Sequence, residues 1–224
     1  NNSAGQILAD KLLLSTEQLT NTDGTILVQN ELNLHSPLLA NLRGIISAQT
    51  LNITGNTLDN TGGQLLTAKA LNISTGQLTN LDGIINSQQT LQLSAAELNN
   101  RSGVIQGVNL FNAQVQGSTD NHSGQLLAGA NLQLHSGLLD NTQGTVAAGG
   151  QLNIHTTALQ NNDAGVISGT ALNITATTLR NDVQARIEGQ QLQLTTQSLT
   201  NAGTLLAAGQ QGDSLVLLAD VLNN

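Results

Sequence analysis

Apolar and polar residues alternate along most of this chain, in short runs separated by turns rich in Gly, Asn, Asp and Thr. The segment Leu51-Asn52-Ile53-Thr54 is one example, and similar segments begin at Leu71, Leu91, Leu152 and Leu172. A spacing of two between apolar residues predicts β-strands, whereas an α-helix would need spacings of three and four. The pattern therefore predicts a chain of short strands and turns.

The alternating pattern repeats about every 20 residues. Each unit starts at an asparagine, which a leucine usually precedes by two positions and a glycine usually follows by three, as in Leu78, Asn80 and Gly83. Thr119 departs from the leucine column. Such a period is typical of solenoid proteins. The sequence predicts eleven units, which start at Asn2, Asn21, Asn41, Asn60, Asn80, Asn100, Asn121, Asn141, Asn162, Asn181 and Asn201.

A unit of three short strands cannot bury its apolar side alone, but units stacked at the ~4.8 Å separation of paired strands can. The sequence therefore predicts an all-β fold, a parallel β-helix (solenoid) of about 11 coils of about 20 residues. We expect three short strands per coil and a rod of roughly 50 Å. The asparagine would turn the chain in a left-handed conformation, and its amide would bond to those of adjacent coils. The glycine would supply positive φ or close backbone approach.

The composition excludes several functions. The 224 residues include one Phe, no Trp, Tyr, Met or Cys, and a formal charge of −8 at pH 7. Without Cys there are no disulfides and no thiolate metal sites. Without clusters of Lys and Arg, no nucleic-acid partner is expected. No apolar run is long enough for a transmembrane helix, and no signal peptide or cap is visible. We expect residues 1–224 to be a single β-helical segment, a fragment of a longer protein.

Two units are irregular. Phe111 and Ala113 replace a leucine and an isoleucine of the repeat, so a large residue beside a small one could conserve the local volume. The turn after them is shifted, and it is the candidate contact surface for a partner, with residues Gln114, Gln116, Ser118, Thr119 and Asp120. The unit at Asn181 lacks its glycine and is predicted to form local ion pairs among Arg180, Asp182, Arg186 and Glu188.

The repeated unit, held over essentially the whole chain, resembles the haemagglutinin repeats of filamentous haemagglutinin and of contact-dependent growth-inhibition exoproteins. The resemblance implies a right-handed β-helical filament that carries adhesive or toxin-delivery regions away from a bacterial cell. It also implies two-partner secretion, with export through the periplasm and an outer-membrane transporter to the cell surface. The partners implied are that transporter and a target-cell receptor or host glycan.

Candidate chemical sites are few. His35, His135 and His155 share one column, where a polar surface ladder is expected and a metal-binding or pH-sensitive pair is the alternative. Carboxylates at Asp59 and Asp140, and at Asp23 and Asp82, show no acid and base pairing of the kind that glycoside hydrolysis needs. Scattered Thr residues do not form the flat array that ice binding would use. No cofactor, metal or small-molecule substrate is predicted.

Taken together, the residues and the resemblance predict a structural shaft segment of a secreted bacterial exoprotein, used for adhesion or for contact-dependent toxin delivery. A receptor-binding or glycan-binding region of such an exoprotein is the first alternative. A carbohydrate-active β-helix enzyme is the second, and the chain is predicted not to be an enzyme.

Overall fold

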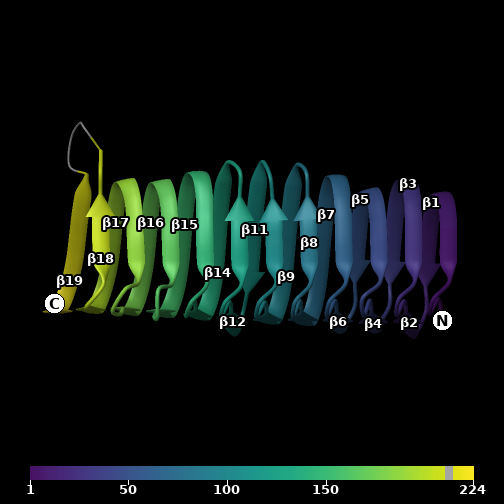
Figure 1. The fold of residues 1–224 in the computed structure, drawn as a ribbon, viewed down its shortest axis with the longest axis horizontal. Helices are drawn as coiled ribbons and strands as arrows, with labels where there is room; N and C mark the ends of the chain where they lie inside the picture. Colours follow the sequence, from purple (N-terminus) through teal and green to yellow (C-terminus); the bar gives the residue numbers. More distant parts are fainter. Residues whose placement is uncertain (210–213) are drawn as a thin grey trace.

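The computed structural model describes residues 1–209 and 214–224. It shows one rod of stacked coils, with the N and C termini at opposite ends (Figure 1). The described residues form parallel strands and turns without a helix, which confirms the predicted all-β solenoid of about 11 coils.

The strands follow the coils in order along the chain. They are β1 (Gln6–Ser15), β2 (Gln18–Thr20), β3 (Thr25–His35), β4 (Leu38–Ala40), β5 (Ile45–Thr54), β6 (Thr57–Asp59), β7 (Gln64–Thr79), β8 (Ile84–Ser87), β9 (Thr90–Asn99), β10 (Val104–Gly107), β11 (Leu110–Val115), β12 (Ser118–Asp120), β13 (Gln125–Ala128), β14 (Asn131–Asp140), β15 (Thr145–Asn161), β16 (Val166–Asn181), β17 (Arg186–Asn201), β18 (Thr204–Ala207) and β19 (Leu215–Asn223).

Each coil has three faces, which we name from the third coil. The first face follows the glycine (residues 45–48), the second carries the Leu-Asn-Ile-Thr segment (51–54), and the third is the short strand Thr57–Asp59. Among the described residues, three separate strands, as predicted, occur only in the coil of β10, β11 and β12. Elsewhere neighbouring faces join into one bent strand, as in β7, which has 16 residues.

Register between coils keeps equivalent residues on top of one another. Leu51 pairs with Leu71, and Leu71 pairs with Leu91. These leucines are 0% exposed, and the inward residues of all three faces join one continuous aliphatic core. Burying a side chain of this size is worth about 1.5–3 kcal/mol before the entropy of ordering it is subtracted. Every second residue of a strand points inward, and because each coil covers its neighbours, these inward residues form an interior without solvent.

The asparagines form the predicted ladder inside the rod. Each Nδ2 donates to the Oδ1 of the next asparagine, at 2.7–2.9 Å, without a break from Asn2 to Asn224. One predicted start is wrong: Asn161, not Asn162, lies in the ladder, 0% exposed and bonded to Asn141 and Asn181. Asn162 lies in the turn, because this turn holds one more residue than most, which hides the register in the sequence.

The asparagine does not adopt the left-handed conformation predicted for it. That conformation belongs to the residue two positions later, such as Asp23 (φ 53°), Arg43 (φ 54°) and Asp82 (φ 52°). The glycine one residue further on is needed for close approach. A Cβ on Gly44 would lie 2.0 Å from the Asn21 carbonyl oxygen and 2.5 Å from Asn41 Oδ1. The two turn requirements therefore fall on two different residues, and neither is the asparagine.

The predicted volume exchange in the irregular coil is present. Phe111 pairs with Leu91 and Leu132, and Ala113 pairs with Leu93 and Leu134. Phe111 and Ala113 are both 0% exposed. One large and one small side chain thus fill the space that two aliphatic residues fill in adjacent coils.

Candidate functional site

The shifted turn is a β-bulge of one residue. Val115 pairs with Ala95 and Thr119 with Leu98, so three residues of this coil span a distance that two residues span in the coil before it. The next coil again uses two residues for this distance, because Gln114 pairs with His135 and Thr119 pairs with Leu139. Such an extra residue breaks the hydrogen-bond ladder locally and must find another partner for its backbone.

Glu97 supplies that partner. Its Oε2 accepts hydrogen bonds from the Ser118 backbone N–H at 2.7 Å and from the Ser118 hydroxyl. Both contacts lower the pKa of the Glu97 carboxyl below its usual value, and the hydroxyl contact has the larger effect. The bulge is therefore stabilised by a side chain from the preceding coil.

The five residues of the predicted contact surface have different environments. Gln114 and Gln116 are exposed, whereas Ser118 is held by Glu97 and Asp120 accepts a hydrogen bond from Arg101 at 3.0 Å. Thr119 is 0% exposed and lies in the core, where its hydroxyl bonds to Ser136 at 2.9 Å. The exposed glutamines are the members of the set that a partner could reach.

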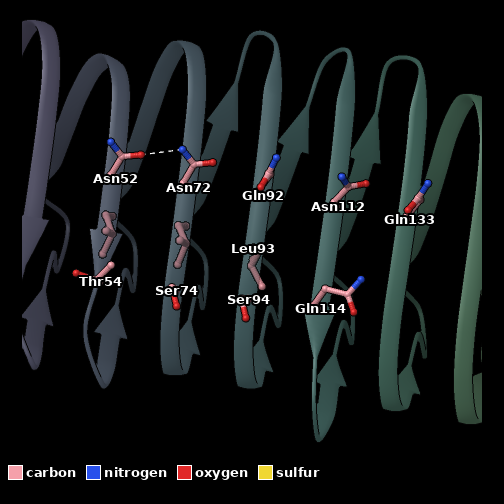
Figure 2. Close-up of a pocket in the computed structure, with 12 residues that line it drawn as sticks. Asn52, Thr54, Asn72, Ser74, Gln92, Leu93, Ser94, Asn112, Gln114 and Gln133 are labelled. Atoms are coloured by element: carbon pink, nitrogen blue, oxygen red, sulfur yellow. Dashed lines mark hydrogen bonds between the residues drawn. The ribbon is translucent and has the colours of Figure 1, made fainter.

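A surface hollow of about 510 Å³ lies along the second face. Figure 2 shows its polar side chains in two rows across successive coils, one row of Asn and Gln and one row of Ser, Thr and Gln114. The lining has no charged side chain; it consists of Asn52, Ile53, Thr54, Asn72, Ile73, Ser74, Gln92, Leu93, Ser94, Asn112, Gln114 and Gln133. The hollow thus offers neutral donors and acceptors that repeat once per coil.

A second, exterior ladder of amides runs along this face. Asn72 donates to Asn52 at 2.7 Å, and Asn52 donates to Asn33 at 2.7 Å. Asn112 Oδ1, further along the same row, is buried and has no hydrogen-bond partner among the described residues. A buried amide oxygen without a partner costs free energy, so this position is a weak point of the row.

The histidines lie at the edge of the same face. His135 pairs with His155 in adjacent coils, and their ring centroids are 5.4 Å apart. His35 lies in the same column, where its Nδ1 is 2.9 Å from the Thr54 hydroxyl. All three rings are exposed. Together they form an exposed column at the edge of the second face. Within the described residues there is no group of three or more His, Cys, Asp or Glu side chains that could hold a metal ion.

The acidic residues lie mainly on the turns and the third face, where they serve local structure. Asp59 Oδ1 accepts from the Thr61 N–H and hydroxyl. Arg43 makes two hydrogen bonds to Asp23, at 2.8 Å each, and these lower the pKa of the Asp23 carboxyl. The predicted ion pairs of the unit at Asn181 are present: Arg180 with Asp182 and Arg186 with Glu188. These carboxylates support turns and pairs rather than a shared reaction centre.

The comparisons with known proteins give the family. The haemagglutinin-repeat model matches residues 1–36, 29–95, 79–157 and 131–222, which is nearly the whole chain. The chain belongs to the haemagglutinin-repeat family. Neither the curated proteins nor the solved structures contain a match. Haemagglutinin repeats are typical of secreted surface exoproteins and are non-enzymatic in general.

Sequence reasoning did not find the hollow of this haemagglutinin-repeat segment. The signal was present as a column of Asn and Gln, one per coil, from Asn33 to Gln193. The repeat alone explains this column, because a column of residue types does not show whether the surface there is hollowed.

In the described part of the chain, no helix is both long and apolar enough to cross a membrane.

Proposed function

We propose that this chain is a shaft segment of a large secreted bacterial exoprotein, which holds an adhesive or toxin-delivering region away from the cell. The observation that carries the proposal is the unbroken interior asparagine ladder, which runs with the aliphatic core from the first coil to the last. A rod with one continuous core has a fixed length per residue, and this is the property that a spacer needs.

The proposal includes export by two-partner secretion, with an outer-membrane transporter as the partner during export. Two features of the chain support this route. It has no Cys, so no disulfide must form or break during passage. Its contacts join each coil to the next, so a coil that emerges from a pore can fold on its predecessor.

Deletion of whole coils in the intact exoprotein tests the shaft function. Removal of residues 60–99 takes out two coils and joins Asp59 to Asn100 in register. Export and surface display should persist, with a reach shortened by about 10 Å. The control deletion of residues 60–89 ends in mid-coil and should block folding. Loss of target-cell contact in a two-coil deletion that is displayed normally would contradict a spacer role.

The hollow on the second face supports a second function, contact with a neutral host glycan or receptor. Its neutral amides and hydroxyls suit sugar hydroxyls. Binding of the 224-residue chain to a panel of neutral oligosaccharides should fall about tenfold in Gln114→Ala. Gln116→Ala, an exposed position that does not line the hollow, is the control and should bind normally. Binding to no member of the panel would remove this function and leave the shaft function standing.

A further inference from the structure

The outward side of the first face carries an aliphatic stripe that the solenoid fold does not require. Each coil presents two outward side chains there, because the side chain between them points into the core. In each of the first nine coils, one of the two is aliphatic and the other is an uncharged polar residue. The two outward residues per coil are Gln6 and Leu8, Thr25 and Leu27, Ile45 and Ser47, Gln64 and Leu66, Ile84 and Asn86, Val104 and Gln106, Gln125 and Leu127, Thr145 and Ala147, and Val166 and Ser168.

The stripe is accessible and uncharged in a chain whose formal charge is −8. Leu8, Leu27 and Ile84 are 68%, 42% and 38% exposed, and the aliphatic residues of the other six coils are half-buried. The first charged outward residues on this face are Arg186 and Glu188 of the tenth coil, which pair with each other. A stripe of exposed and half-buried apolar side chains is a feature of interaction surfaces. We propose that the stripe pairs with the stripe of a second copy of this chain.

The spacing of the stripe favours a second copy over other partners. Its side chains recur once per coil, at the ~4.8 Å separation of paired strands. Another copy presents side chains at the same spacing, so each contact made at one coil is repeated along the rod. The acidic residues of the third face, Asp59, Asp120 and Asp140, lie on strands other than those of the first face. The turn residues Asp23 and Asp82 lie beside the first face, and Asp23 is paired with Arg43. Two acidic rods can therefore approach through their neutral faces.

The order of residues selects an antiparallel arrangement. In a parallel pair, the twofold axis would run along the rods. The first outward residue of each coil would then face the second outward residue of the same coil in the other copy. In all nine coils an aliphatic residue would then face a polar one. A twofold axis parallel to the strands instead keeps first positions against first positions, with the two rods running in opposite directions.

One antiparallel register matches like with like in six of the eight coils that it pairs. When the axis passes between the fourth and fifth coils, Ile45 faces Val104 of the second copy, and Ser47 faces Gln106. One coil further out, Leu27 faces Leu127. In the two central coils an aliphatic residue faces a polar one. The charged tenth coil then falls outside the eight paired coils. Eight coils at ~4.8 Å and four residues at ~3.3 Å give roughly 500 Å² per copy. The total of about 1,000 Å² is the lower limit for a specific interface, so the pair should be weak and reversible.

Sedimentation equilibrium tests the pairing. The wild-type chain should show a monomer and dimer equilibrium between micromolar and millimolar concentrations. Ile84→Lys should weaken association at least tenfold, because it buries a charge at the centre of the paired face. Leu38→Lys is the control, since Leu38 is 50% exposed on the third face, and it should associate like wild type. A wild-type chain that stays monomeric overturns the pairing. Association that survives Ile84→Lys overturns it too, because contacts between strand edges of the terminal coils would behave that way.

Single cysteines test the register, because the chain has no Cys of its own. A mixture of Leu27→Cys and Leu127→Cys should form a disulfide-linked heterodimer under mild oxidation. Either variant alone should not, since its own symmetry mate would be five coils away, at about 24 Å. Leu27→Cys mixed with Leu38→Cys is the control for random collision. Equal cross-linking in the control, or efficient self-linking of Leu27→Cys, would overturn the antiparallel register.

Discussion

Asn80 illustrates how one side chain can serve three coils. Its Nδ2 donates to Asn100 Oδ1, to the Gly83 carbonyl and to the Val104 carbonyl, and its Oδ1 accepts from Asn60. The residue is 0% exposed, so these groups have no access to water. A buried amide is stable here only because every donor and acceptor around it is used.

Replacing Asn80 by Ala should therefore destabilise the rod by at least about 2 kcal/mol, because it leaves several buried groups without partners. Asn72→Ala is the matched control in the exterior ladder, where water can replace the lost amide, and it should cost under about 1 kcal/mol. Chemical denaturation of both variants measures the difference. Equal losses would show that the interior ladder contributes no more than the exterior one.

Two adjacent glycines allow the turn requirements to be separated. Gly62 has φ +61°, and a Cβ there would meet only the flexible Arg43 side chain, at 3.3 Å, whereas a Cβ on Gly63 would lie 2.0 Å from the Asn41 carbonyl oxygen. Gly62→Asn should be nearly neutral, because asparagine tolerates the left-handed conformation. Gly63→Ala should cost more than about 2 kcal/mol, because backbone must move. Thermal unfolding of the two variants measures this, and a larger loss for Gly62→Asn would contradict our account.

At the scale of single residues, the sequence predicted which side chains are interior but not all of their conformations. The leucine column and the asparagine ladder follow from period and polarity, as Leu71 and Asn80 show. The left-handed residue was misplaced because its position accepts Asp, Arg, Ser, Gln and Gly, so no single residue type marks it. Close approach at glycine depends on the coil below, which lies about 20 residues away in the sequence.

The bulge at residues 116–118 shows the same limit at the scale of elements. An unusual spacing in the sequence revealed an irregular turn, but not where its side chains point. Thr119 was assigned to the surface because its neighbours are polar, and the structure places it in the core, where Ser136 bonds to its hydroxyl. The contact predicted for Gln114 and Gln116 stays a prediction.

Glu97 makes the bulge sensitive to pH. Its pKa is lowered in the folded state by Ser118, so its contribution to stability is present above the unfolded pKa of about 4.3 and is lost as pH falls through the lower, folded value. Glu97→Gln should lower the melting temperature slightly at pH 7, and the difference from wild type should shrink as the pH falls below about 4.3. Melting curves across this range test it.

A matched control for Glu97 is Glu17→Gln, because the Glu17 carboxylate has no hydrogen-bond donor among the described residues. It should leave the melting temperature unchanged at pH 7. A loss of stability for Glu97→Gln that persisted at low pH would show that packing on Gly117, and not the charge, is what the side chain provides.

Over the whole molecule, contacts run only between neighbouring coils, so position along the rod should decide the cost of a substitution. Leu91 and Leu12 occupy one core column, but Leu91 is 0% exposed in mid-rod and Leu12 is partly buried in the first coil. Leu91→Ala should cost about 2–5 kcal/mol. Leu12→Ala should cost less, because a terminal coil can fray by itself. Denaturant titration measures both, and equal costs would contradict a solenoid of nearest-neighbour contacts.

The interior ladder also aligns the amide dipoles of its side chains along the rod. Every amide of this interior ladder donates toward the C-terminal side, so its side-chain dipoles all point one way and polarise one another. A coil that forms after its predecessor presents a carbonyl oxygen to an amide hydrogen already fixed in place. Growth from the N-terminal end would therefore lengthen this row of aligned dipoles by one amide per coil. Growth from the C-terminal end would start from a coil whose asparagine oxygen has no donor until the preceding coil forms.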